Sequence, residues 1–169
     1  ILDHQIKILN TGRIVAGKGH IDMINACEIL HDNGINFILN IVGDGDNTYV
    51  EKIKNHAKNM SYSDKITFHG YQSNIPKYLN ENDIFLFPSY GEGLSNSFTE
   101  ALSYGLVCLS YDNTSFSEFT DLGFHTHLAE NNDQYSLAKQ LLKIAKNLED
   151  EKNKSMKNIK KAPKIFSYE

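Results

Sequence analysis

The stretch Asn36-Phe-Ile-Leu-Asn-Ile-Val-Gly-Asp-Gly45 is a nearly continuous apolar run that ends at two closely spaced glycines. A strand of a parallel sheet has this composition when helices cover both of its faces. The following residues, 46–60, carry apolar side chains at helical spacing. A buried strand followed by an amphipathic helix is the repeating unit of a doubly wound α/β fold.

The same alternation extends along the chain in both directions. The apolar pattern predicts strands at 7–11, 36–42, 65–69, 83–87, 106–109 and 124–128, and helices at 18–31, 46–60, 75–79, 97–104 and 136–148. We therefore expect an α/β domain with a doubly wound parallel sheet of about six strands and helices on both faces. Such a fold binds its ligands in the loops at the carboxyl edge of the sheet.

Length and composition indicate one soluble domain. The chain has 169 residues and a formal net charge of −4, which argues against a general nucleic-acid binder. No apolar run approaches the roughly 20 residues that span a bilayer. Cys27 and Cys108 lie in apolar segments, and we expect two reduced core thiols and a cytoplasmic location. Residues 1–148 are interpreted as a Rossmann-like domain, and residues 149–169 as a charged helical extension of it.

The loop Gly12-Arg-Ile-Val-Ala-Gly-Lys-Gly19 joins the first expected strand to the first helix. Its glycines allow close approach of a ligand, and Arg13 and Lys18 supply positive charge for a phosphate or diphosphate. The helix that follows adds free backbone N–H groups. The spacing also resembles a P-loop, except that Gly19 stands where Ser or Thr would hold Mg²⁺.

A second loop, Pro88-Ser-Tyr-Gly-Glu-Gly-Leu-Ser-Asn-Ser-Phe-Thr-Glu-Ala101, places two carboxylates at the same edge of the sheet. Glu92 and Glu100 can accept hydrogen bonds from sugar or ribose hydroxyls. The segment 97–100 also fits a capping box, with Ser97 as the helix cap and Glu100 reaching back to it.

Two further patterns contain residue types that can carry chemistry. His125 and His127 share one face of an expected strand, but no third ligand at a fixed spacing is evident, so the sequence predicts no metal site there. The segment from Ser115 to Glu118 fits a second capping box and is assigned no functional role.

The chain resembles the C-terminal half of group 1 glycosyltransferases. This resemblance rests on the joint occurrence of Arg13, Lys18-Gly19, Glu92-Gly-Leu-Ser-Asn96 and Glu100-Ala101. These are retaining enzymes of the GT-B fold that use nucleotide-sugar donors. The similarity extends over most of the chain, and the spacing from Glu92 to Glu100 is its most specific element.

The resemblance implies a role for each of these residues. Arg13 and Lys18 would hold the donor diphosphate and stabilise the charge on the leaving nucleotide, and Glu92 would face the transferred sugar, so these three are the expected catalytic residues. Glu100 would bind the ribose. The remaining expected nucleotide-sugar contacts are Gly70 and Tyr71, near the base, and Gly93, Leu94, Ser95 and Asn96, around the phosphate and sugar.

The resemblance also implies the partners of the chain. Its partners would be the nucleotide-sugar donor and an acceptor-binding domain preceding Ile1, without which the chain would be inactive. No cofactor or metal is expected, and membrane association would come only through the parent enzyme. Two alternatives stay open at this point: a P-loop-like NTPase and a non-enzymatic α/β interaction module.

Overall fold

The computed structural model describes residues 4–91 and 95–166 of the chain. Its centre is a six-stranded parallel sheet in the order β3-β2-β1-β4-β5-β6. The strands are β1 (Ile6–Thr11), β2 (Phe37–Val42), β3 (Ile66–Gly70), β4 (Ile84–Phe87), β5 (Val107–Tyr111) and β6 (His127–Ala129). The predicted fold class and all six strands are confirmed, with small shifts at their ends.

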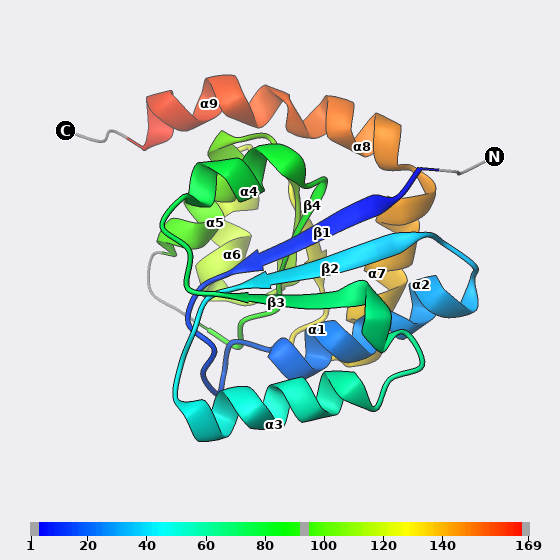
Figure 1. Ribbon diagram of the computed structural model, residues 1–169. Helices are drawn as coiled ribbons and strands as arrows, with labels where there is room; N and C mark the ends of the chain where they lie inside the picture. The colour runs from blue at the N-terminus through cyan, green and yellow to red at the C-terminus, as the bar shows by residue number, and fades with distance from the viewer. Residues whose placement is uncertain (1–3, 92–94, 167–169) are drawn as a thin grey trace.

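Helices cover both faces of this sheet (Figure 1). One layer contains α1 (His20–Ala26), α2 (Glu28–Asp32), α3 (Asn47–Lys58) and α7 (Gln134–Lys146). The other contains α4 (Ile75–Glu81), α5 (Asn96–Ser103), α6 (Thr114–Asp121) and α9 (Lys157–Ile165). A 3₁₀ turn, η1 (Ser63–Lys65), precedes β3, and α8 (Leu148–Ser155) leads into α9. Within the described residues, no helix has the length and apolar character needed to cross a bilayer.

The core on the α5 side is built largely from aromatic rings. Phe87 on β4 packs against Phe98 of α5 and Phe116 of α6, with ring centroids 6.3 and 5.9 Å away. Near the end of the described chain, the ring of Phe166 stacks on Phe124 at 5.3 Å and meets Phe119 edge-on. Burial of such rings dominates the stability of a core, so the segment after α9 contributes to it. Cys27 and Cys108 are both buried and free, as predicted.

The expected helix at 18–31 and the expected strand at 124–128 differ most from the structure, which also contains an additional helix, α6. The helix expected at 18–31 begins only at His20, because Gly17 and Gly19 hold left-handed backbone angles that a helix cannot use. It then divides at Cys27 into α1 and α2. Helix α6 was not predicted, and β6 starts at His127 because Asn158 takes both the backbone N–H and the carbonyl of His125.

Both predicted capping boxes are wrong in their cap residue. Ser95, not Ser97, caps α5, and its Oγ accepts a hydrogen bond from the Phe98 N–H at 3.2 Å. Asn113, not Ser115, caps α6 by accepting from the Ser115 N–H at 3.2 Å. In each case the true cap has extended backbone angles, as a helix cap requires.

The charged C-terminal stretch forms α8 and α9, which cross above the sheet in Figure 1. One face of the pair is buried at Leu148, Glu151, Ser155, Asn158 and Ala162. Helix α9 packs against α5. These helices therefore belong to the packed molecule, while the division at residue 148 stays a prediction.

Candidate functional site

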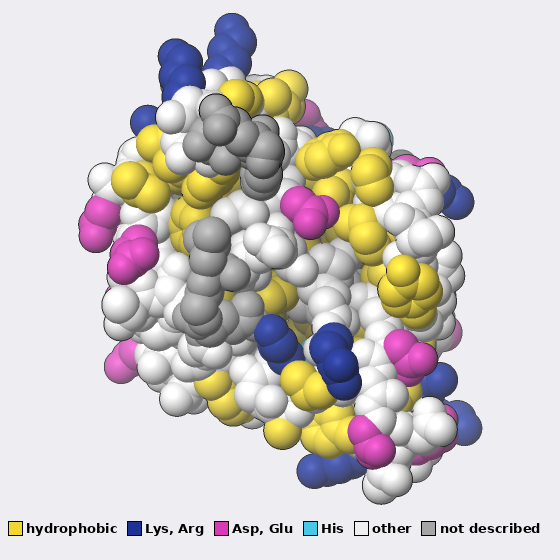
Figure 2. Space-filling model, turned by 90° about the vertical axis from the view of Figure 1, so that its left-hand side faces the viewer, with side chains coloured by type: hydrophobic (Ala, Val, Ile, Leu, Met, Phe, Trp, Pro, Cys, Tyr) yellow, Lys and Arg dark blue, Asp and Glu magenta, His cyan; other side chains and the backbone are white. Residues whose placement is uncertain are grey.

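A pocket of about 580 Å³ opens at the carboxyl edge of the sheet, where β1, β2 and β3 end and α5 begins. The strand order reverses between β1 and β4, and open α/β sheets bind ligands at such a switch point. Figure 2 looks onto this edge and shows basic side chains in a hollow of the surface. The lining residues are Thr11, Gly12, Arg13, Val42, Gly43, Asp44, Gly45, Tyr71, Gln72, Ser73, Ile75, Ser97 and Glu100.

Backbone contacts between three successive loops form the floor of this pocket. The Gly43 N–H donates to the Gly70 carbonyl at 2.8 Å, and the Gly12 N–H donates to the Val42 carbonyl at 3.1 Å. A Cβ at Gly43 would overlap the Gly12 carbonyl oxygen, and the φ of 140° also suits only glycine. The loops after β1 and β2 can therefore meet only because Gly43 has no side chain.

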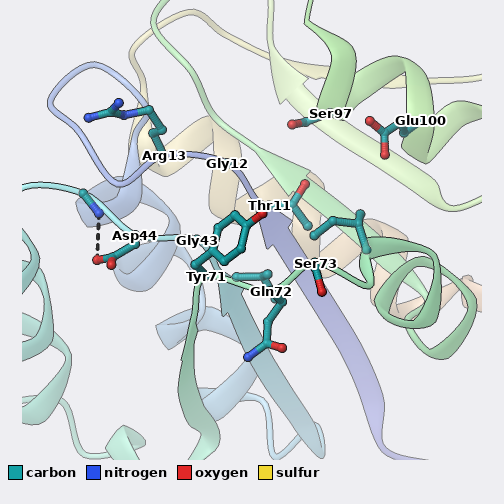
Figure 3. A pocket seen from close by; sticks show the side chains of 13 residues that line it. Thr11, Gly12, Arg13, Gly43, Asp44, Tyr71, Gln72, Ser73, Ser97 and Glu100 are labelled. Carbon is teal, nitrogen blue, oxygen red and sulfur yellow. Dashed lines mark hydrogen bonds between the residues drawn. The ribbon is translucent and has the colours of Figure 1, made fainter.

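Arg13 is the only arginine of the chain, and its exposed side chain lies on the wall of this pocket. A guanidinium offers a planar fork of N–H donors that matches two phosphate oxygens at once. Asp44 also lines the pocket, and its carboxylate accepts the Gly45 N–H at 2.8 Å, the bond drawn in Figure 3.

Glu100 lies on the other side of the pocket from Arg13 (Figure 3). Glu100 belongs to α5, which begins at Asn96, and its side chain lines the pocket. Partial burial raises the pKa of the Glu100 carboxyl above its ordinary value. Tyr71 projects from the end of β3 with 77% of its surface exposed, so its ring is available for stacking.

Lys18 does not line this pocket but lies in the same β1–α1 loop, against the loop after β4. The Tyr90 N–H donates to the Gly17 carbonyl at 2.8 Å, and a Cβ at Gly19 would overlap the Pro88 carbonyl oxygen. The Lys18 ammonium sits 5.9 Å from the centre of the Phe87 ring. Lys18 is therefore placed near the end of β4, next to the pocket.

The other predicted site residues lie around this pocket or outside the described part. Gly70 ends β3 directly before Tyr71, and Ser95 and Asn96 form the start of α5. Glu92, Gly93 and Leu94 lie outside the described residues. The structure thus brings Arg13, Tyr71 and Glu100 together in one pocket.

The loop that precedes Glu92 is anchored by a buried carboxylate on α1. Asp22 accepts hydrogen bonds from the hydroxyls of Tyr90 and Tyr111 at 3.0 and 2.6 Å. Its other oxygen accepts from the Gln134 amide at 2.7 Å. Burial and the bond to Asp22 raise the pKa of both tyrosine hydroxyls, so both stay protonated donors. This network fixes the first part of the β4–α5 loop, at Tyr90, to α1, β5 and α7.

Sequence reasoning missed several residues of the pocket wall. Asp44 was seen only as part of a glycine-flanked turn, and Ser97 only as a helix cap. Thr11, Gln72 and Ser73 were given no role. All five lie at or just after the end of a strand or near the start of the next helix, a position that could have identified them.

The family model of glycosyl transferases group 1 matches residues 1–164 of the chain. The chain belongs to this family. Membership of this family decides against the two alternatives that the sequence left open, the P-loop-like NTPase and the non-enzymatic interaction module.

Two curated group 1 relatives illustrate the match. The amylovoran biosynthesis glycosyltransferase AmsK of Erwinia amylovora is 30% identical over 85% of the chain and 37% of its own length. An N-acetylgalactosaminyltransferase of Campylobacter jejuni, which acts on an undecaprenol-diphosphate-linked sugar, is 26% identical over 94% of the chain and 43% of its own length. The chain spans less than half the length of these relatives.

Solved structures show the same fold for this glycosyltransferase domain. HepE of Anabaena, solved with UDP and glucose, has a TM-score of 0.86 at 16% identity, over 96% of the chain and 44% of its own. The C-terminal domain of LpcC from Francisella tularensis has a TM-score of 0.79 at 18% identity, over 95% of the chain and 85% of that domain. The architecture is that of the Rossmann-like half of a GT-B glycosyltransferase.

Proposed function

We propose that the chain is the donor half of a retaining glycosyltransferase and binds a nucleoside diphosphate sugar in the pocket at the carboxyl edge. The observation that carries the proposal is the meeting of Arg13, Tyr71 and Glu100 in one cavity of about 580 Å³. Ligand pockets of roughly 300–1,000 Å³ hold small molecules of nucleotide size. The solved relative HepE, which shares the fold, binds UDP and glucose.

Each of these three groups fits one part of such a donor. The Arg13 guanidinium matches the diphosphate, and the Glu100 carboxylate accepts hydrogen bonds from the two ribose hydroxyls. The exposed Tyr71 ring offers a stacking surface for the base. Lys18 and the start of α5 extend the site toward the sugar, the part of the donor that the family resemblance assigns to Glu92.

In the proposed reaction, the bond between the anomeric carbon of the sugar and the diphosphate oxygen breaks. A bond between the acceptor hydroxyl oxygen and that carbon forms on the same face, and the hydroxyl proton passes to the departing diphosphate. Arg13 and Lys18 stabilise the charge that grows on the leaving group. Their two positive charges take the place of a divalent metal, so we expect chelators to leave donor binding unchanged.

Calorimetric titration with UDP, ADP and GDP and their sugars tests the donor site. We expect one nucleotide series to bind, and Arg13→Ala to weaken it about 10- to 100-fold, the effect of losing a charged hydrogen-bond partner. Arg13→Lys keeps the charge but loses the planar fork, so it should recover binding only in part. Lys58→Ala, an exposed cation at the far end of α3, is the matched control and should bind as the wild type does.

The ribose contact has its own test with the 2′,3′-dideoxy analogue of the nucleotide that binds. The wild type should prefer the ribose form, whereas Glu100→Ala should bind both forms equally. A wild type that binds no nucleotide at millimolar concentration, or an Arg13→Ala variant with unchanged affinity, would show that the donor site is misassigned.

A further inference from the structure

Two imidazoles and a carboxylate converge where strand β6 meets helix α8, away from the donor pocket. The Nε2 atoms of His125 and His127 lie 2.7 and 2.6 Å from the same oxygen of Glu151, Oε2. The two histidines belong to a His-Thr-His segment, with His125 just before β6 and His127 on it. Glu151 lies on α8, which follows β6 after the intervening helix α7. Tertiary packing thus supplies the third group that the sequence pattern lacked.

The donor set matches what zinc selects in proteins. Two histidine nitrogens and one glutamate oxygen are the three protein ligands of one common class of zinc site. One ligand atom from each residue lies within 4.8 Å of the other two. Tetrahedral ligands at about 2.0–2.1 Å from zinc are about 3.3 Å apart, so each hydrogen-bonded pair here needs to open by less than about 1 Å.

Burial makes this a formed site rather than a chance surface cluster. The side chains of His127 and Glu151 expose only 15% and 12% of their surface, and that of His125 exposes 32%. The backbone of His125 is held by both side-chain atoms of Asn158 on α9, at 3.0 Å each. The three ligands therefore come from elements that are already fixed relative to one another.

We propose that His125, His127 and Glu151 bind one Zn²⁺ ion, with the fourth position taken by water or a small anion. The ion accepts the lone pair of each Nε2 atom, and the proton that each nitrogen donated to Glu151 moves to Nδ1 or to solvent. The bound ion would fasten the edge strand β6 to α8 and so stabilise the whole domain.

The surroundings of the site determine its affinity and its fourth ligand. His125 also lines a groove of about 620 Å³ whose other wall carries Lys154, Lys157, Lys160, Lys161 and Lys164. This groove gives an ion a route from solvent. The positive charge lowers the affinity for a cation and favours an anion such as chloride at the open position.

Zinc titration of the chelator-treated chain, followed by calorimetry and by thermal unfolding, tests the proposal. We expect one zinc per chain and, at about 100 times the dissociation constant, a rise in Tm of about 5–10 °C. Cobalt should give the intense visible bands of a tetrahedral site. His127→Ala and Glu151→Gln should abolish both responses, while His4→Ala, which removes an exposed imidazole outside the cluster, should retain them.

Glu151→Gln is the informative variant, because its amide oxygen can still accept the two imidazole N–H groups. Its Tm without metal should therefore stay near that of the wild type, which separates metal binding from a loss of folding. An unchanged wild-type Tm at excess zinc would overturn the proposal, as would cluster variants that respond like the wild type. Nucleotide affinity should be the same with and without zinc, so this result is independent of the donor site.

Discussion

At the scale of the single residue, His20 is an unusual buried group in the described part of the chain. It starts α1 directly after the Gly17–Gly19 turn, is 1% exposed, and neither ring nitrogen has a hydrogen-bond partner among the described residues. Burial, together with the positive charge of Lys18, lowers the pKa of His20 to about 4. The imidazole therefore stays neutral in the folded protein at pH values around 6.5, where the same side chain would take up a proton in the unfolded chain.

This difference makes the stability depend on pH. Between about pH 6.5 and pH 4 the unfolded chain takes up a proton at His20 and the folded chain does not, so the free energy of unfolding falls as the pH falls. From pH 7 to pH 4.5 we expect a loss of about 2–3 kcal/mol from this residue. Urea unfolding of the wild type and His20→Leu at both pH values measures it.

His20→Leu should lose that part of the pH dependence and become the more stable of the two proteins in acid. His31→Leu, which removes a partly exposed imidazole on α2, is the matched control and should follow the wild type. Parallel pH profiles for the wild type and His20→Leu would mean that His20 is protonated in the folded state as readily as in the unfolded state.

At the scale of the element, the start of α5 determines how the donor pocket is formed. Ser95 caps the helix two residues earlier than the Ser-x-x-Glu pattern indicates, and Glu100, which the pattern would pair with the cap, lines the pocket. The hydroxyl of Ser97 lines the same pocket instead of closing the helix end.

Two single substitutions distinguish these caps. Ser95→Ala should lower the free energy of unfolding by about 1 kcal/mol, the usual effect of losing a side-chain cap. Ser97→Ala should leave it nearly unchanged, because the Phe98 N–H keeps its bond to Ser95. Urea unfolding monitored by circular dichroism gives both values. A larger loss from Ser97→Ala than from Ser95→Ala would restore Ser97 as the cap.

Strands could be predicted from the sequence more accurately than the ends of helices. Strand positions followed directly from apolar runs, because a strand covered on both faces must be apolar along its length. Helix ends were less predictable, since the choice between Ser95 and Ser97 depends on the backbone angles of the incoming loop. The charged C-terminal extension was expected to be helical, but its packing was not foreseen, because Glu151, Ser155 and Asn158 are polar residues on a buried face.

The candidate sites depended even more on tertiary packing. Arg13 and Glu100 were identified because each belongs to a local motif. Thr11, Gln72 and Ser73 line the pocket only because three loops meet at Gly43. Glu151 joins His125 and His127 from a separate helix, so no fixed spacing could have revealed the cluster.

At the scale of the whole molecule, the chain spans less than half the length of the curated relatives described above. It covers 44% of HepE and 37% of AmsK, but 85% of the isolated C-terminal domain of LpcC. The proposed donor pocket lies at the carboxyl edge of the sheet, on the side of the molecule that Figure 2 shows. This geometry fits a site that is completed by a second domain carrying the acceptor.

We therefore expect the isolated chain to bind its nucleotide sugar but to transfer no sugar. Release of nucleoside diphosphate, measured with a coupled assay in the presence of donor and a panel of lipid and glycan acceptors, should stay at the background rate. The longer relative AmsK, of which the chain covers 37%, is the comparison enzyme in the same assay. Turnover by the 169 residues alone that disappears in Arg13→Ala would contradict the proposal that sugar transfer requires a second domain.

The stacking of Phe166 on Phe124 bears on how such halves can be exchanged between enzymes. Through Phe119 and Phe98, these rings are continuous with the aromatic core beneath β4. A chimaeric transferase built with this domain must therefore carry the chain through Phe166. A junction after Leu148, where the composition changes, would omit Phe166 and expose the aromatic core to water. The chimaera would then aggregate instead of acquiring a new donor specificity.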